Sequence, residues 1–200
     1  NRRNEIQSPR LIRQLIDSIS MPQQLEFEDY LRYDKRSKIF ASFHYGNFIY
    51  GLHKAMIYAQ HSLECKVLSE STYSKNLVSN LQTGFLGQAA DVETQLLLND
   101  TDSRLMSAFL RRTDTGLLMF ADLPSQYGET ISVNFLSRMA RFPKGIAMIA
   151  LANRIPIVPI ICLEQARGPT IEIGKVIEPK IRLGEDREAA LIRITQQLIG

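Results

Sequence analysis

The segment at residues 43–48, Phe-His-Tyr-Gly-Asn-Phe, gathers in one short turn the residue types that acid–base chemistry uses. A histidine can exchange a proton near neutral pH, so His44 is the candidate general base. Gly46 lets the backbone turn sharply or approach a ligand closely, and Asn47 can cap a following helix. We take Gly46 and Asn47 as candidate substrate-binding residues. A histidine that merely caps or packs the turn is the alternative.

A carboxylate that could assist this histidine is Asp122, which ends a second apolar run at residues 116–121. If the two runs are parallel strands, Asp122 lies at the same sheet edge as His44. There it could orient the imidazole or bind substrate, and His44 and Asp122 form the candidate catalytic pair. An aspartate that only caps a loop through backbone N–H groups is the alternative.

Basic residues without acidic neighbours form a third candidate feature. The stretch 130–163 contains no Asp or Glu, and its basic residues are Arg138, Arg141, Lys144 and Arg154. Such a strip suits an anion, for example the phosphates of coenzyme A or phosphopantetheine, an acidic carrier helix or a lipid headgroup. Pro143 predicts a helix start, whose unpaired N–H groups would help Arg141 and Lys144 to bind it. We take Arg138, Arg141 and Lys144 as substrate-binding candidates; ordinary solvated charge is the alternative.

The elements that must position these residues alternate between strands and helices. This order predicts an α/β layered domain with a mostly parallel central sheet flanked by helices. We expect a single domain over 1–200, with an N-terminal helical segment at 1–36 and an α/β core at 37–200. Pro159 predicts an edge or bulge in its strand. Strands are predicted at 38–42, 65–68, 116–121, 131–135, 157–162 and 170–173, and helices at 9–19, 24–32, 48–60, 75–85, 101–110, 143–153 and 185–198.

Composition narrows the class of protein. The chain has 200 residues, 44% hydrophobic and 22% charged, which is typical of a globular protein. A net charge of +3 does not indicate a nucleic-acid partner. Cys65 and Cys162 match no disulfide or metal framework, and a polar N-terminus predicts no secretory signal. Since the most apolar stretch, 145–163, is interrupted by charge and proline, we expect no membrane span and a cytoplasmic protein.

The block His-Tyr-Gly-Asn-Phe at 44–48 resembles one in the late lipid A acyltransferases. These are the lauroyl and myristoyl transferases of the lysophospholipid acyltransferase-like superfamily. Further segments follow that family's order, and the resemblance covers roughly residues 39–163. These segments are Phe-Ala-Asp at 120–122, Val-Asn-Phe at 133–135, the basic Pro-Lys-Gly turn at 138–145, Ala150 and Pro-Ile-Val-Pro at 156–159.

The resemblance implies an acyltransferase of that superfamily's fold. The acyl donor would be a thioester of acyl carrier protein or coenzyme A, with no other cofactor. Independently of the resemblance, the sequence has no cysteines or paired acids at metal-ligand spacing, so we expect no metal site. The acceptor would be a lipid or a small molecule with a hydroxyl or amine. The resemblance also implies peripheral contact with the inner membrane.

One departure from the family concerns the residue that supports the histidine. The family places an acid after His and four further residues, whereas this chain has Ile49 there, and Ser137 replaces a usual glycine. Another carboxylate, Asp122 or Glu70, could orient His44, or the acceptor could be an amine, which needs less help from a base. Alternatively, the protein is a catalytically lapsed module that binds an acyl group or carrier protein. A peripheral membrane scaffold with a basic face is a third hypothesis.

Overall fold

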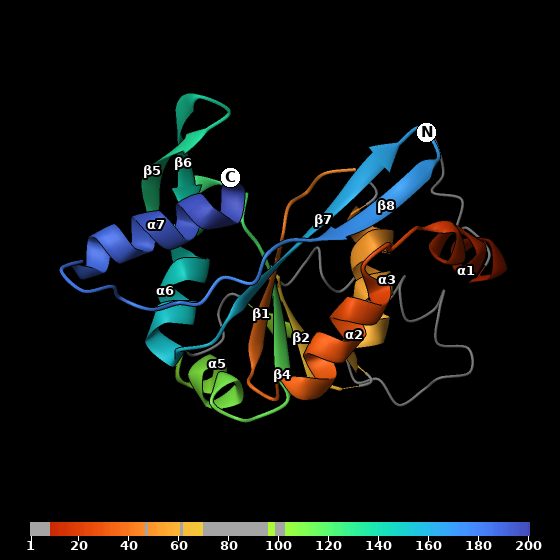
Figure 1. The fold of residues 1–200 in the computed structure, drawn as a ribbon, viewed down its shortest axis with the longest axis horizontal. Helices are drawn as coiled ribbons and strands as arrows, with labels where there is room; N and C mark the ends of the chain where they lie inside the picture. The colour runs from red at the N-terminus through yellow and green to blue at the C-terminus, as the bar shows by residue number, and fades with distance from the viewer. Residues whose placement is uncertain (1–8, 47, 61, 70–95, 99–102) are drawn as a thin grey trace.

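The computed structural model describes residues 9–46, 48–60, 62–69, 96–98 and 103–200. The described chain is a mixed α/β structure built on a six-stranded sheet of order β3-β2-β4-β1-β7-β8 (Figure 1). Neighbouring strands from β3 to β7 are parallel, and β8 at the edge is antiparallel to β7. The strands are β1 Lys38–Ser42, β2 Glu64–Ser69, β3 Leu96–Leu98, β4 Thr115–Phe120, β7 Ile157–Gln165 and β8 Gly168–Ile173.

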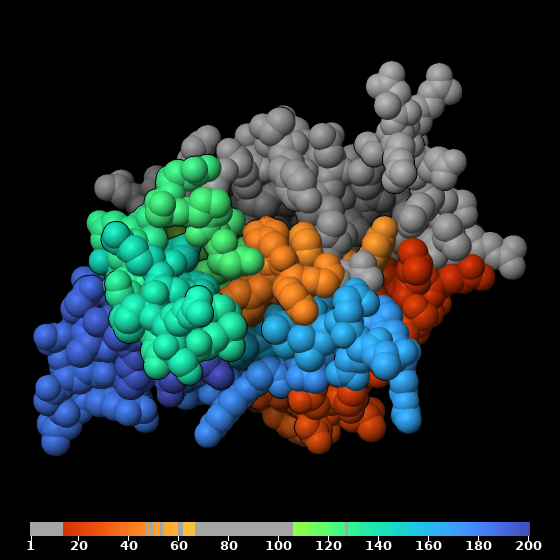
Figure 2. All heavy atoms as spheres, turned by 90° about the horizontal axis from the view of Figure 1, so that it is seen from above, coloured from red at the N-terminus to blue at the C-terminus, as the bar shows by residue number. Residues whose placement is uncertain are grey.

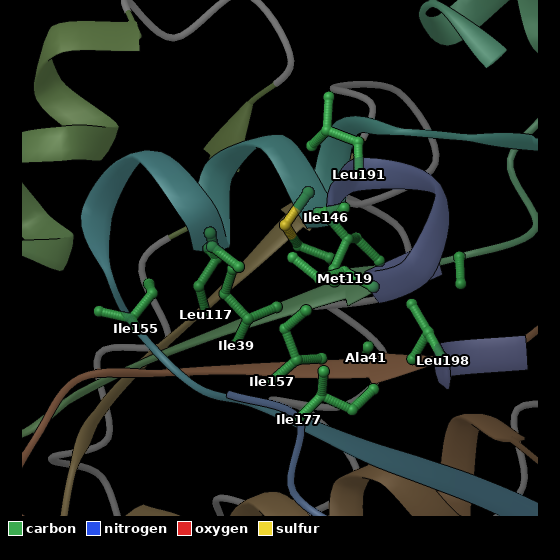
Figure 3. Packing of buried hydrophobic residues seen from close by; sticks show 14 of the residues in the cluster. Ile39, Ala41, Leu117, Met119, Ile146, Ile155, Ile157, Ile177, Leu191 and Leu198 are labelled. Atoms are coloured by element: carbon green, nitrogen blue, oxygen red, sulfur yellow. The ribbon is translucent and has the colours of Figure 1, made fainter. Parts of the chain in front are cut away.

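The sheet carries an apolar core on each face because alternate residues of its central strands point to opposite sides. In β1, Ile39 and Ala41 belong to one core and Phe40 to the other. The first core packs against helices on its own side, and Figure 3 shows Ile39 and Leu117 below Ile146 and Leu191. β1 is buried along its whole length and is therefore a fixed reference for the turn that follows it.

Helices cover both faces. The first core takes buried residues from α5, α6 and α7, and the second takes them from α1, α2 and α3. No helix within the described ranges is long and apolar enough to cross a membrane. The helices are α1 Pro9–Ser18, α2 Gln24–Tyr33, α3 Phe48–Gln60, α5 Ser103–Leu110, α6 Gly145–Asn153 and α7 Arg187–Ile199.

The α/β class and the mostly parallel sheet are thus confirmed. The helix α3 and the strand β1 have the predicted bounds, because each follows a clear apolar pattern. The helix predicted at 75–85 lies outside the described residues.

Two proline-based predictions, an edge position for Pro159 and a helix start at Pro143, are wrong. Pro159 lies in β7, which has β1 on one side and β8 on the other, and not at an edge. It is tolerated because pairing with β1 ends at Ala41–Pro159 and pairing with β8 begins at Ile160. Proline has no amide hydrogen to donate, and Pro159 lies where the pairing with β1 ends and just before the pairing with β8 begins.

Pro143 ends a strand instead of beginning α6, whose first residue is Gly145. This strand, β6 Arg138–Pro143, was not predicted. It pairs antiparallel with β5 Thr130–Phe135 in a separate two-stranded sheet, which we call the β5–β6 hairpin.

Helix α3 approaches β7 closely, and a glycine makes this approach geometrically feasible. A Cβ atom at position 51 would lie well inside van der Waals contact of Cys162 Sγ. Cys162 Sγ in turn lies 3.8 Å from the carbonyl oxygen of Phe48, to which it donates. The start of α3, and with it the turn that carries His44, is therefore held against β7.

Candidate active site

His44 and Asp122 meet at the carboxyl edge of the sheet. β1 and β4 are parallel with Ser42 opposite Phe120, and the Ala121 amide donates to the Ser42 carbonyl at 2.8 Å. Each strand is therefore followed, two residues later, by one member of the pair. His44 Nδ1 lies 2.8 Å from Asp122 Oδ1, and the His44 backbone N–H donates to Asp122 Oδ2, also at 2.8 Å.

The contact with Asp122 defines the chemistry of the imidazole. An ionised carboxylate only accepts hydrogen bonds, so Nδ1 must carry the hydrogen in this contact. The neutral ring then has its lone pair on Nε2, the nitrogen that can accept a proton from a substrate. The side chains of His44 and Asp122 are 38% and 29% exposed, so a substrate can approach the pair from solvent.

Aromatic rings fix the plane of the imidazole. Phe120 stacks on His44 with centroids 4.1 Å apart and an interplanar angle of 21°. Phe48, at the start of α3, meets the same imidazole edge-on at 5.1 Å. The two phenylalanines also contact each other edge-to-face, with centroids 5.7 Å apart. Phe120 from β4 and Phe48 from α3 thus hold the His44 ring through apolar contacts, in addition to its polar contact with Asp122.

Gly46 brings the turn close to β7. Its φ is +58°, and a Cβ atom there would lie 2.9 Å from the Cys162 carbonyl oxygen. The same Cβ would lie 3.6 Å from Glu164 Oε1, so a second carboxylate borders the turn. Glu164 is not among the predicted site residues; its position at the end of β7, the strand beside β1, is what brings it to this turn.

The turn that carries His44 is exposed on the face above the carboxyl edge. Figure 2 shows the orange segment around the β1–α3 turn between the green-to-teal segment after β4 and the blue β7–β8 hairpin. Two surface hollows in the described part, of about 550 and 460 Å³, lie beside Tyr30 and Arg154, and neither is lined by His44.

The basic candidates lie on or beside the β5–β6 hairpin. Arg138 is exposed on β6, and Arg141 Nε donates to Thr130 Oγ1 of β5 at 3.0 Å. Lys144 is ion-paired with Glu129 at 2.6 Å and lies 3.9 Å from Glu188. Glu129 lies directly before the acid-free stretch, so the stretch alone does not show the charge that pairs with Lys144. The Lys144 ammonium is therefore already matched by a carboxylate.

Neither cysteine suits nucleophilic chemistry. Burial raises the pKa of the Cys162 thiol to about 11 and that of the Cys65 thiol to about 12. Both are thus neutral thiols at physiological pH. Among the residues that the structure describes, no three His, Cys, Asp or Glu side chains gather as a metal site.

Some predicted site residues cannot be placed. Asn47 and Glu70 lie outside the described residues. Ile49 belongs to the first turn of α3, and its backbone alone is described. Of the two carboxylates considered for orienting His44, Asp122 is the one seen to contact it.

Comparison with known proteins adds no relative: no protein-family model and no curated protein matches the sequence.

Proposed function

We propose that this protein is an acyltransferase that moves an acyl group from a thioester to a hydroxyl or amine. The observation that carries the proposal is the contact between His44 Nδ1 and Asp122 Oδ1 at 2.8 Å. The motif order along the chain, together with the α/β sheet, supports placement in the lysophospholipid acyltransferase-like superfamily. The donor would be acyl carrier protein or coenzyme A, and the acceptor a lipid or a small molecule.

In this mechanism His44 is the general base and Asp122 is its positioning residue. As the acceptor O–H or N–H attacks the thioester carbonyl, His44 Nε2 takes the acceptor's proton. A new C–O or C–N bond forms and gives a tetrahedral oxyanion. When the C–S bond breaks, the thiolate leaves and receives the proton from the imidazolium. Asp122 stabilises that imidazolium and keeps the hydrogen of the ring on Nδ1.

The oxyanion needs donors on the side of the turn away from Asp122. Backbone N–H groups in the first turn of α3 are candidates, because that helix begins only four residues after His44. The Arg141 guanidinium is a second possible donor, but it lies on the β5–β6 hairpin, where its Nε donates to Thr130 Oγ1. The proposal therefore assigns this task to backbone groups.

The pairing with Asp122 bears on the missing family acid. An isoleucine at position 49 cannot orient an imidazole, but the carboxylate of Asp122, just after β4, can do so from another direction. This favours an active enzyme over the catalytically lapsed binding module. It also makes hydroxyl acceptors accessible, since alcohols depend more than amines on a base.

The test is intact-mass analysis of products after mixing the protein with acyl-carrier and acyl-coenzyme A thioesters and a panel of hydroxyl and amine acceptors. Transfer that is lost in His44→Ala and kept in the exposed-loop control Leu183→Ala is expected. Stable binding of a thioester without turnover, equal in wild type and His44→Ala, would instead identify a binding module.

A further inference from the structure

The tip of the β5–β6 hairpin presents apolar side chains to solvent. Leu136 is 82% exposed, Met139 71% and Phe135 36%. In Figure 1 the tip projects past α7 and stands clear of the other described elements. Exposed apolar residues gathered on one projection commonly mark a surface that binds a partner.

The tip keeps a leucine where the backbone disfavours one. Phe135 pairs with Arg138, and the two residues between them have positive φ, +49° at Leu136 and +64° at Ser137. Such two-residue turns favour asparagine and glycine, because a branched side chain is strained there. Since Leu136 gains almost no burial in return, its presence points to a use outside the fold.

The hairpin is held firmly enough to act as a fixed projection. At its base, Ile131 and Val133 are buried in the first core. Beside the tip, the Gln196 side chain of α7 donates to the Asn134 carbonyl at 2.7 Å and accepts from the Asn134 N–H at 2.8 Å. These contacts keep the apolar tip outward.

Arginines lie on both faces of the hairpin that carries this tip. The register places Arg138 on the face of Phe135, and Arg141 on the opposite face with Met139. The chain from 130 to 163 holds no acid, and Glu129 at the base of the hairpin is paired with Lys144. An exposed apolar tip with arginines below it is complementary to an anionic bilayer, whose acyl region is apolar and whose phosphates are negative.

We infer that the tip of the β5–β6 hairpin inserts into an anionic phospholipid surface. Leu136 and Met139 enter the acyl boundary, and Arg138 and Arg141 contact lipid phosphates. A bilayer fits better than a protein partner, because the tip is a narrow projection rather than a groove or a flat face. The inference goes beyond the proposed chemistry and does not depend on activity at His44.

The decisive variant is Leu136→Asn. Asparagine tolerates a positive φ better than leucine, so the fold should gain stability while the tip loses its apolar side chain. We expect a raised melting temperature together with vesicle affinity reduced more than about tenfold. The matched control is Leu183→Asn, at a fully exposed leucine outside the hairpin.

The assay is flotation with phosphatidylcholine vesicles, with or without phosphatidylglycerol. Wild type should float with the anionic vesicles, and Arg138→Gln/Arg141→Gln should lose most of that preference. Absence of wild-type flotation with anionic vesicles, or flotation of Leu136→Asn equal to wild type, would overturn the inference. Binding of the tip to an acidic carrier protein without any vesicle binding would assign it to a protein partner instead.

Discussion

Asp122 accepts two hydrogen bonds from a single residue, one from the ring and one from the backbone of His44, each 2.8 Å long. The carboxylate therefore fixes the position of the turn as well as the orientation of the imidazole. It can do both because β1 and β4 are parallel neighbours whose ends lie level, at Ser42 and Phe120.

The first prediction concerns the hydrogen on the His44 ring. When the imidazole is neutral, we expect this hydrogen on Nδ1, because the Asp122 carboxylate can only accept a hydrogen bond. Ring ¹⁵N chemical shifts measure this tautomer directly, with His53 and His61 as internal references. In Asp122→Ala the fraction of the neutral ring that carries its hydrogen on Nδ1 should fall. A wild-type ring protonated on Nε2 alone would contradict the structure.

Gly46→Ala should destabilise the protein and displace the turn. A positive φ costs a non-glycine residue about 1–2 kcal/mol, and the added Cβ would lie 2.9 Å from the Cys162 carbonyl oxygen. For a chain of this size, about 2 kcal/mol corresponds to a melting temperature lowered by roughly 4–8 °C. The control is Gly145→Ala in α6, where a Cβ meets nothing within 4 Å and stability should hold or rise slightly. Equal melting temperatures for the two variants would show that Gly46 is not constrained.

Gly51→Ala should be partly rescued by Cys162→Ala. The first change forces a methyl group against the Cys162 sulfur, at a cost of about 1–3 kcal/mol, and the second removes that sulfur. A double-mutant cycle by urea unfolding measures the coupling. Strictly additive effects would mean that α3 and β7 do not meet through this pair.

Acid should remove a stabilising contact at the opposite edge of the sheet. Arg36 Nη2 lies 2.7 Å from Asp34 Oδ2 and 2.8 Å from Glu178 Oε1. Hydrogen bonding by Arg36 lowers the pKa of Asp34 from 3.8 to about 2. Because the folded pKa lies below the unfolded one, this stabilisation is present above about pH 4 and is lost as the pH falls towards 2.

Asp34→Asn tests this dependence. Its deficit in unfolding free energy relative to wild type should be about 1 kcal/mol at pH 7, after solvent screening is allowed for, and should shrink towards pH 2. Urea unfolding at several pH values measures it. A deficit that stays constant with pH would exclude the carboxylate charge as its source.

Local pattern was sufficient to predict much of the scaffold. β1 is a run of apolar and small residues, and α3 has apolar residues at helical spacing, so both were predicted with their bounds. β6 was missed because its arginines and its terminal proline obscure the alternation, and it exists through pairing with β5. Pro143 fits the end of a strand as well as a helix start, since its fixed φ suits both.

The site was only partly predictable, because it also depends on pairing between strands that are distant in sequence. Asp122 could be assigned to the sheet edge of His44 on the assumption of parallel strands. Whether the two side chains touch depends on the register of β1 against β4, which no short-range pattern encodes. The stacking of Phe120 on His44 and the approach of Glu164 to Gly46 likewise arise from strands that are distant in sequence.

The most direct test of the central claim is the single-turnover rate of acyl transfer by Asp122→Asn. An amide nearly preserves the shape of the carboxylate but cannot stabilise an imidazolium as an anion does. With an acyl thioester and an acceptor on which wild type turns over, we predict a rate lower by about 10²–10⁴ and a little-changed melting temperature. A folded Asp122→Asn protein that transfers the acyl group within about twofold of the wild-type rate would contradict a mechanism based on His44 and Asp122.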